Sequence, residues 1–83
     1  MSMSTTSNAN LDWIAFGQYV KSTRERLGLS QKDFAQLIGK YQPDIGCIEK
    51  GTRQSTVETC FRIAEAFGIS PTTLFSKFNK VEN

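Results

Sequence analysis

Apolar residues recur along the chain at the three- and four-residue spacings of α-helices, in five short segments separated by glycine or serine. No stretch alternates apolar and polar residues for long enough to predict a strand. The first helix is predicted to begin near Asn10 or Asp12 and to end at Leu27, because Gly28 favours a left-handed cap. Its expected apolar face consists of Phe16, Val20, Thr23 and Leu27.

The second segment is predicted to begin at Ser30, whose side chain can accept from a backbone amide three residues later. Asp33 suits the same turn, because the N-terminal end of a helix dipole favours an acid. Gly39 ends the segment. Its expected apolar stripe consists of Phe34, Leu37 and Ile38, with Ala35 beside them.

The third segment, residues 39–51, predicts a weak helix. Pro43 lies near its start and Gly46 in its middle, and both disfavour an isolated helix. Ile45 and Ile48 are its only large apolar residues, and their spacing of three puts them on one face. This helix is therefore expected to depend on docking against a core.

Two further helices are predicted in the C-terminal third. Ser55 opens a capping-box sequence that closes with Glu58, and Gly68 ends the helix that follows. Ser70 and Pro71 predict the start of the last helix, as N-cap and first-turn residues. The expected apolar positions are Val57, Cys60, Phe61, Ala64 and Phe67 in the fourth helix and Leu74, Phe75 and Phe78 in the fifth.

Five short helices that each carry one apolar face predict an all-α fold, a compact five-helix bundle. The length of 83 residues allows one domain, expected over residues 11–79. Residues 1–10 are polar and uncharged and are predicted to form a disordered tail, and residues 80–83 are predicted to fray. There is no signal-peptide-like start and no apolar run near the roughly 18 residues of a membrane span, so a cytoplasmic protein is expected.

Charge is unevenly distributed along the chain. Residues 21–53 hold seven basic and four acidic side chains, which gives +3. Residues 54–83 hold three of each sign, and residues 1–20 hold only Asp12. A basic excess confined to one segment indicates a polyanionic partner.

The chemistry of the chain argues against an enzyme. There is no histidine, so the common zinc patterns are excluded, and Cys47 and Cys60 are expected to be reduced thiols. Neither a glycine-rich phosphate loop nor a paired-carboxylate cleft is evident. No catalysis, cofactor, metal or small-molecule ligand is therefore expected.

The segments Gln31–Ile38 and Gln42–Glu49, joined by a turn that opens with Gly39, have the spacing of a helix-turn-helix. The distinctive sequences are Arg24, GLSQKDFAQLIG (28–39), YQPDIGCIEKG (41–51) and VETCFRIAEAFGISPTTLF (57–75). With these motifs the chain resembles the Cro and phage-repressor type of helix-turn-helix regulator, the xenobiotic-response-element family, over residues of about 16–75.

The resemblance implies a sequence-specific DNA-binding transcriptional regulator whose second motif helix lies in the major groove. Gln42 is the best candidate for reading a base, because a glutamine amide pairs bidentately with adenine N6 and N7. Pro43, Gly46 and Cys47 are expected on or beside the same face. Pro43 either starts the helix or contacts a thymine methyl, and Cys47 either touches a base edge or acts as a thiol that blocks binding when oxidised.

Phosphate contacts are expected from residues around the two motif helices. Gln31 adds a side-chain donor at the N-terminus of the first. Lys40 and Tyr41 precede the second, and relatives more often carry a small hydroxyl residue at the position of Tyr41. Arg53 lies in a loop that faces the DNA backbone in relatives, and Lys50 is a further candidate.

Two acids in the motif have structural interpretations. Asp44 suits the first turn of its helix through the dipole, and can alternatively accept from cytosine N4. Glu49 lies at the C-terminal end of the same helix, where the dipole disfavours an acid, so it needs a cationic partner. The resemblance implies that Arg24 is this partner and that the pair joins the first helix to the recognition helix.

A single domain this small offers few DNA contacts, so a homodimer on a palindromic operator is expected, acting as a repressor. The last helix is expected to supply the dimer surface. Leu74 is expected to face inward, Phe78 and Val81 outward, and Phe75 to complete the surface.

Two other functions remain open at the level of sequence. The same fold can serve as a protein-interaction module, such as the antitoxin of a toxin–antitoxin pair, or as a restriction-modification controller protein. Trp13 and Ile14 precede the region of family resemblance and either extend the core or form a second contact surface.

Overall fold

The computed structural model describes residues 11–79, and within this range the chain forms five α-helices. The helices are α1 (Trp13–Arg26), α2 (Gln31–Leu37), α3 (Gln42–Lys50), α4 (Val57–Phe67) and α5 (Pro71–Phe78). The predicted all-α, five-helix architecture is confirmed. The predicted tail, residues 1–10, and the predicted frayed end, residues 80–83, lie outside the described residues.

Three helices begin at the caps that the sequence predicts. The side chains of Asp12, Ser30 and Ser70 each accept a hydrogen bond from the backbone amide three residues later. Such bonds satisfy donors that the first turn of a helix otherwise leaves unpaired. At the other ends, Gly51 and Gly68 adopt the left-handed conformation, with φ of 75° and 74°.

The fourth helix begins one residue later than predicted. Thr56 is its N-cap and accepts from the amide of Thr59 at 3.1 Å, so the predicted capping box from Ser55 to Glu58 is wrong. Ser55 is instead buried, and the Glu58 carboxylate lies on the surface, where it accepts from Arg62 at 2.7 Å. A run of consecutive hydroxyl residues allows either register, and packing selects the one observed.

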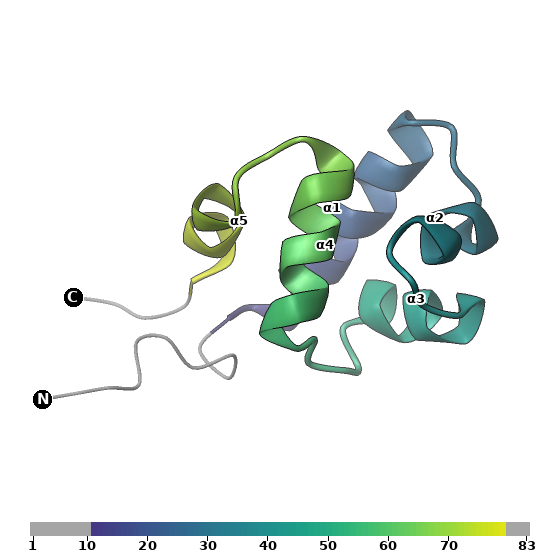
Figure 1. Cartoon of the computed structure of the whole chain (residues 1–83). Helices are drawn as coiled ribbons and strands as arrows, with labels where there is room; N and C mark the ends of the chain where they lie inside the picture. The colour runs from purple at the N-terminus through teal and green to yellow at the C-terminus, as the bar shows by residue number, and fades with distance from the viewer. Residues whose placement is uncertain (1–10, 80–83) are drawn as a thin grey trace, which may run out of the picture.

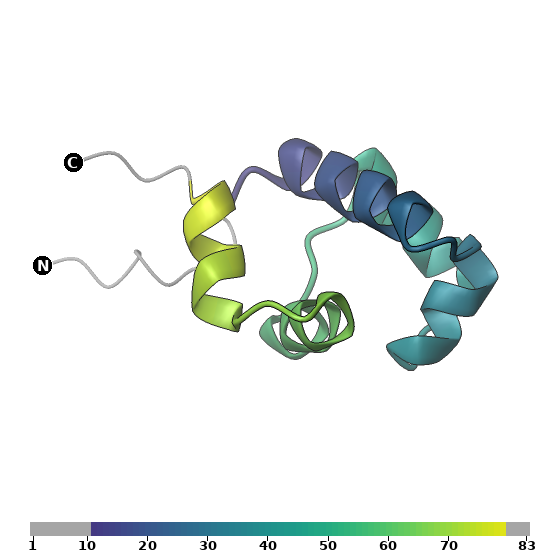
Figure 2. The same cartoon turned by 90° about the horizontal axis from the view of Figure 1, so that it is seen from above.

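The helices are arranged so that α2 and α3 lie at one end of the molecule and α5 at the other (Figures 1 and 2). α1 connects the two ends, and its most extensive interhelical contacts are with α3. The beginning and end of the described chain meet beside α5. There Leu11 and Asn79 form an isolated antiparallel bridge, and the Asp12 amide donates to the Phe78 carbonyl at 2.7 Å.

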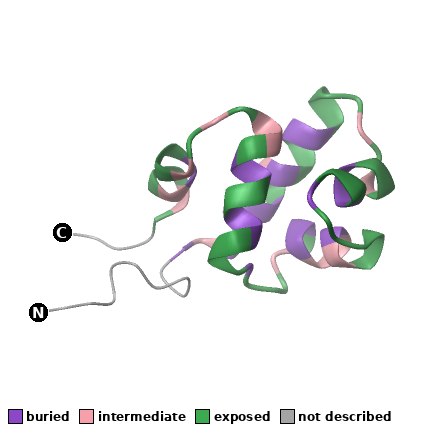
Figure 3. Ribbon diagram, viewed as in Figure 1, coloured by how far each residue is buried: buried purple, intermediate pink, exposed green. Residues whose placement is uncertain are grey.

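The core lies between the helices, and its buried positions face inward from each of them (Figure 3). Its largest fully buried side chains are Phe16, Val20, Phe34, Ile38, Ile45, Cys60, Ile63 and Leu74. Trp13 joins this core, with its ring centroid 5.2 Å from that of Phe16 in an edge-to-face arrangement, whereas Ile14 is exposed. Of the two open interpretations, Trp13 therefore extends the core and Ile14 does not.

Several predicted core positions are wrong, and each error has a local reason. Leu27 is 51% exposed because α1 ends at Arg26, before the stripe reaches it. Leu37 is 61% exposed because Phe34 and Ala35 of α2, with Ile38 at its C-cap, face inward instead.

The inward face of α4 is also rotated from the predicted one. It carries Ile63 beside Cys60 and Ala64, which leaves Val57 and Phe61 about half exposed.

Among residues 11–79 no helix has the length and apolarity needed to cross a membrane.

The packing of α1 on α3 depends on a residue without a side chain. A Cβ atom at Gly17 would lie 2.3 Å from the Ile48 carbonyl oxygen and 2.6 Å from that of Glu49. Both are backbone atoms at the end of α3, so neither can move aside without moving the helix. Gly17 therefore sets how closely α1 approaches the C-terminal turn of α3.

We expect Gly17→Ala to lower the free energy of unfolding by roughly 1–3 kcal/mol, the usual cost of overpacking a core. The matched control is Gly46→Ala, because a Cβ at Gly46 would meet no atom within 4 Å. In α3 this second change should stabilise the fold by roughly 0.5–1 kcal/mol, since alanine favours a helix. Urea unfolding of both variants measures the change in the free energy of unfolding. Equal changes would show that Gly17 does not set how closely α1 approaches α3.

Candidate nucleic-acid interface

The α2–turn–α3 unit has the geometry of a helix-turn-helix. Ile45 and Ile48 of α3 are buried, at 0% and 3% exposure, and dock the helix on the core. On the opposite side Gln42 and Pro43 are exposed at the first turn. The predicted base-contact residues Gly46 and Cys47 lie one turn further along and are partly exposed. α3 thus buries one face in the core and exposes the other. On the exposed face its small residues leave room for a partner to approach the helix backbone closely.

The start of α3 is fixed by Asp44. Its Oδ2 accepts from the Tyr41 backbone amide at 3.0 Å, and its Oδ1 accepts from Arg53 Nη1 at 2.6 Å. These hydrogen bonds, that from Arg53 above all, hold the pKa of Asp44 below its usual range, and the pKa of Arg53 is raised by the same contact. Both carboxylate oxygens of Asp44 are therefore engaged within the protein, Oδ2 by the start of α3 and Oδ1 by Arg53.

The residues expected at phosphates surround α3. Tyr41 is its N-cap and is 80% exposed. Lys40 and Lys50 are exposed before and at the end of the helix, and half of the Arg53 side chain is exposed while it holds Asp44. These four side chains are thus exposed just before α3 or at and after its end.

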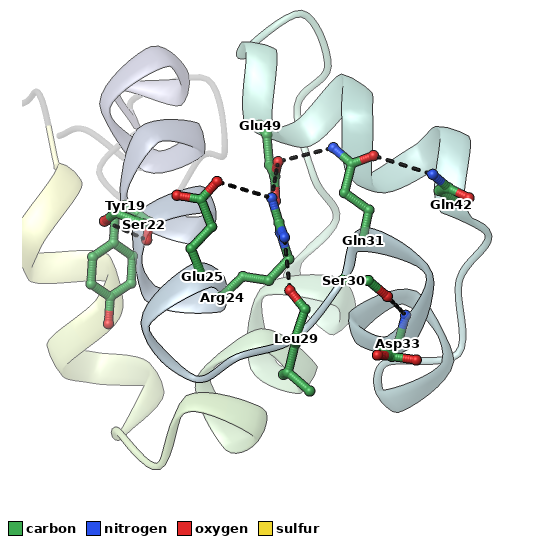
Figure 4. Close-up of polar contacts among 10 residues, drawn as sticks. All are labelled: Tyr19, Ser22, Arg24, Glu25, Leu29, Ser30, Gln31, Asp33, Gln42 and Glu49. Atoms are coloured by element: carbon green, nitrogen blue, oxygen red, sulfur yellow. Dashed lines mark hydrogen bonds and ion pairs between the residues drawn. The ribbon is translucent and has the colours of Figure 1, made fainter.

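Arg24 and Glu49 form a bidentate ion pair between α1 and α3. Arg24 Nε donates to Glu49 Oε2 at 2.6 Å and Nη2 donates to Oε1 at 3.2 Å, with side-chain exposures of 8% and 4% (Figure 4). Arg24 Nη1 also donates to the Leu29 carbonyl at 2.8 Å. The hydrogen bond to Glu49 is the main cause that raises the pKa of Arg24. One guanidinium thus joins α1, the loop before α2 and the end of α3.

Two glutamines extend this pair to the surface (Figure 4). Gln31 Nε2, at the start of α2, donates to Glu49 Oε1 at 3.1 Å. Gln42 Nε2, at the start of α3, donates to Gln31 Oε1 at 3.4 Å. Gln31 is therefore engaged on both sides within the protein, and one proton of its amide is left for another acceptor.

The turn between α2 and α3 is held by a residue that the sequence did not single out. Arg62 of α4 donates through Nη1 to the Ile38 carbonyl at 3.3 Å and through Nη2 to Glu58. Gly39 opens the turn with φ of 72°, and a Cβ there would lie 2.6 Å from Arg62 Nη1. The signal available in the sequence was weak, because an arginine in α4 has no spacing that ties it to this turn.

The two cysteines occupy different environments. Cys60 is fully buried in the core, and this burial raises the pKa of its thiol to about 11. Such a thiol is poorly reactive, because the thiolate is the nucleophilic form. Cys47 is only partly buried on α3. Within residues 11–79 no cluster of three potential metal ligands is present.

Among the described residues expected on α5 at a dimer surface, Phe75 and Phe78 contact different aromatic rings. Leu74 faces inward as predicted, with 1% exposure. Phe78, expected to face outward, is partly buried, and its ring packs against Phe16 and Tyr19 at centroid distances of 5.7 and 5.2 Å. Phe75 is partly buried and its ring lies 6.1 Å from that of Phe61. Val81 lies outside the described residues.

Comparisons with known proteins agree with this geometry. Residues 20–74 match the helix-turn-helix family HTH_3. The restriction-modification controller protein C.AhdI from Aeromonas hydrophila is 34% identical, with a TM-score of 0.70, over 77% of this chain and 97% of that chain. An HTH_3 family transcriptional regulator from Vibrio cholerae is 30% identical, with a TM-score of 0.66, over 77% of this chain and 36% of that chain.

The P22 c2 repressor, solved in complex with a synthetic operator, is 20% identical over 71% of this chain and 89% of that chain. Its TM-score of 0.66 supports the shared fold alone. The search of curated proteins gave no match. The chain belongs to the HTH_3 family of helix-turn-helix proteins. It is a DNA-binding transcriptional regulator of the Cro and phage-repressor type.

Removing one partner of the α1–α3 ion pair should be costly, because the other charge then stays buried without compensation. We expect Glu49→Ala to lower the free energy of unfolding by about 3 kcal/mol or more. The control is Glu58→Ala, which removes an exposed ion pair within α4 and should cost about 1 kcal/mol at most. Thermal unfolding of the two variants decides, and an unchanged melting temperature for Glu49→Ala would refute the role given to the pair.

Proposed function

We propose that this protein is a repressor that reads a palindromic operator as a homodimer, with α3 in the major groove. The observation that carries the proposal is the division of α3 into two faces. Ile45 and Ile48 dock it on the core, while Gln42 stands exposed at its start with its amide held by a neighbouring side chain. A glutamine amide in this place can bond both N6 and N7 of an adenine.

In this proposal the residues around α3 supply the phosphate contacts. Lys40, Tyr41, Lys50 and Arg53 provide cationic or hydroxyl donors, and Gln31 retains one amide proton. Arg53 has donors beyond the one it gives to Asp44, so it can bond a phosphate without leaving that carboxylate. Pro43, Gly46 and Cys47 bring the backbone of α3 close to the base edges.

The dimer surface proposed here differs from the one that the sequence predicts. Val57 and Phe61 of α4 are 47% and 48% exposed, and the Phe61 ring lies against Phe75 of α5. These three residues form the α4–α5 patch, which a second copy can cover by a two-fold contact of the patch with itself. The pairing must place the two recognition helices about 34 Å apart.

The reading role of Gln42 is tested by Gln42→Ala, measured on duplexes that the wild-type protein selects from a randomised pool. We expect preference at one base pair in each half-site to fall by about 1–3 kcal/mol, the value of a bidentate contact. Binding to random duplex and its dependence on salt should stay unchanged, because phosphate contacts produce them. A variant that weakens binding to all sequences equally would show that Gln42 contacts only the backbone.

The dimer is tested by Phe61→Lys, with Leu27→Lys as the control that adds the same charge at an exposed apolar residue outside the patch. Sedimentation should show that the first change weakens dimerisation by roughly tenfold or more, as expected at the centre of an interface. The second change should leave the dimer intact. Wild-type protein that stays monomeric at high micromolar concentration and binds single half-sites would overturn the dimer.

A second candidate function is that of a restriction-modification controller protein. It is favoured by the 34% identity to C.AhdI, which extends over almost all of that chain. Both candidates act on DNA in the cytoplasm without catalysis, and they differ in the genes controlled. Mapping the genes beside the DNA that the protein protects separates the two candidates, because a controller protein requires restriction and modification genes there.

A protein-interaction module without DNA binding, such as an antitoxin that acts only on a protein partner, is distinguished from both candidates by its failure to bind DNA. Such a module would leave random duplex unbound at 50 mM salt, where phosphate contacts are strong.

A further inference from the structure

We propose that Glu49, buried between α1 and α3, is a positioning residue that sets which way the Gln42 amide faces the bases. It acts through Gln31, and the three residues are called the amide chain here. The inference rests on the proposed function, because it takes Gln42 as the residue that reads a base. It adds a residue that touches no DNA to the set that determines sequence preference.

The direction of the amide chain follows from hydrogen-bond chemistry. A carboxylate accepts hydrogen bonds and has no N–H, so Gln31 must turn its NH2 group toward Glu49. The two atoms lie 3.1 Å apart. The carbonyl oxygen of Gln31 then faces the other way, and only an N–H can bond it. Gln42 supplies this donor through Nε2 at 3.4 Å (Figure 4).

The buried ion pair makes Glu49 a fixed reference for this chain. Arg24 holds both carboxylate oxygens through Nε and Nη2, and its own Nη1 is held by the Leu29 carbonyl. The Glu49 side chain is 4% exposed. A carboxylate held in this way cannot rotate freely, whereas an exposed glutamine such as Gln42 otherwise samples several orientations.

The orientation matters because the major-groove edge of adenine has a polarity. It presents N7 as an acceptor beside the N6 amino donor. With one Nε2 proton given to Gln31, Gln42 offers its second proton and its Oε1 on fixed sides of the amide. A reversed amide would place Oε1 against N7, which is also an acceptor. Glu49 therefore determines the order in which Gln42 presents donor and acceptor.

The test compares Gln31→Ala and Glu49→Gln on the selected duplex and on the three alternatives at the base pair that Gln42 reads. Gln31→Ala breaks the amide chain and leaves the Arg24–Glu49 pair untouched. Glu49→Gln introduces an amide donor toward Gln31, which permits both glutamines to turn round. Each variant should reduce preference at that base pair by roughly threefold to tenfold, the range of ordering one long side chain.

Ile63→Val is the control for lost stability, because it removes one methylene from the core without entering the amide chain. It should leave preference at every base pair unchanged. The double variant Gln31→Ala/Gln42→Ala should show the same preference as Gln42→Ala alone, because Gln31 is proposed to act on this base pair through Gln42. If Glu49→Gln does not fold, Gln31→Ala and the double variant still test whether the amide chain acts on the base pair through Gln42.

Two results overturn the inference while the proposed function stands. In the first, Gln42→Ala flattens the preference but Gln31→Ala retains it in full. In the second, Gln31→Ala and Glu49→Gln weaken all duplexes equally, which is the signature of a purely structural role. A Gln42→Ala variant with wild-type preference contradicts the proposed function itself.

Discussion

The buried ion pair between Arg24 and Glu49 is the contact on which the DNA-facing end of this protein depends. It joins the middle of the molecule to the last turn of α3 and, through the Leu29 carbonyl, to the loop that leads into α2. The close approach of α1 at Gly17 lets the two helices pack near this pair. An isolated buried charge is costly, so arrangements of α3 that separate Glu49 from Arg24 are disfavoured.

The recognition helix shows why such an external constraint is needed. α3 has nine residues, and Pro43 and Gly46 lower its helix propensity, so it would be unstable alone. Ile45 and Ile48 supply its apolar anchor, and Asp44 fixes its first turn. Its outer face can then carry small residues that permit close approach to a groove.

Much of this architecture is predictable from sequence because it depends on local chemistry. The helix starts at Ser30 and Ser70 follow from capping, and an acid at the end of α3 requires a cation, as Glu49 does. The rotation of α4 was not predictable, because Val57 and Phe61 fit a helical stripe as well as Ile63 does. Tertiary packing selects between such stripes, and it also places the partly buried Phe78 ring against the core.

The candidate site was likewise predictable from the sequence only in part. Gln42, Arg24 and Glu49 could be named from the motif, whereas the bonds of Gln31 to both Glu49 and Gln42 appear only when helices distant in sequence are placed together. The same is true of Arg62, which holds the turn of the motif from α4.

We infer that α3, held in place by α1, is the element that meets DNA. The most direct test follows backbone amide chemical shifts by NMR while a selected operator duplex is added. We expect the largest shift changes at the start of α3 and the start of α2, with the α4–α5 patch unaffected once the protein is dimeric. Changes confined to α4 and α5, with α3 unperturbed, would contradict this inference.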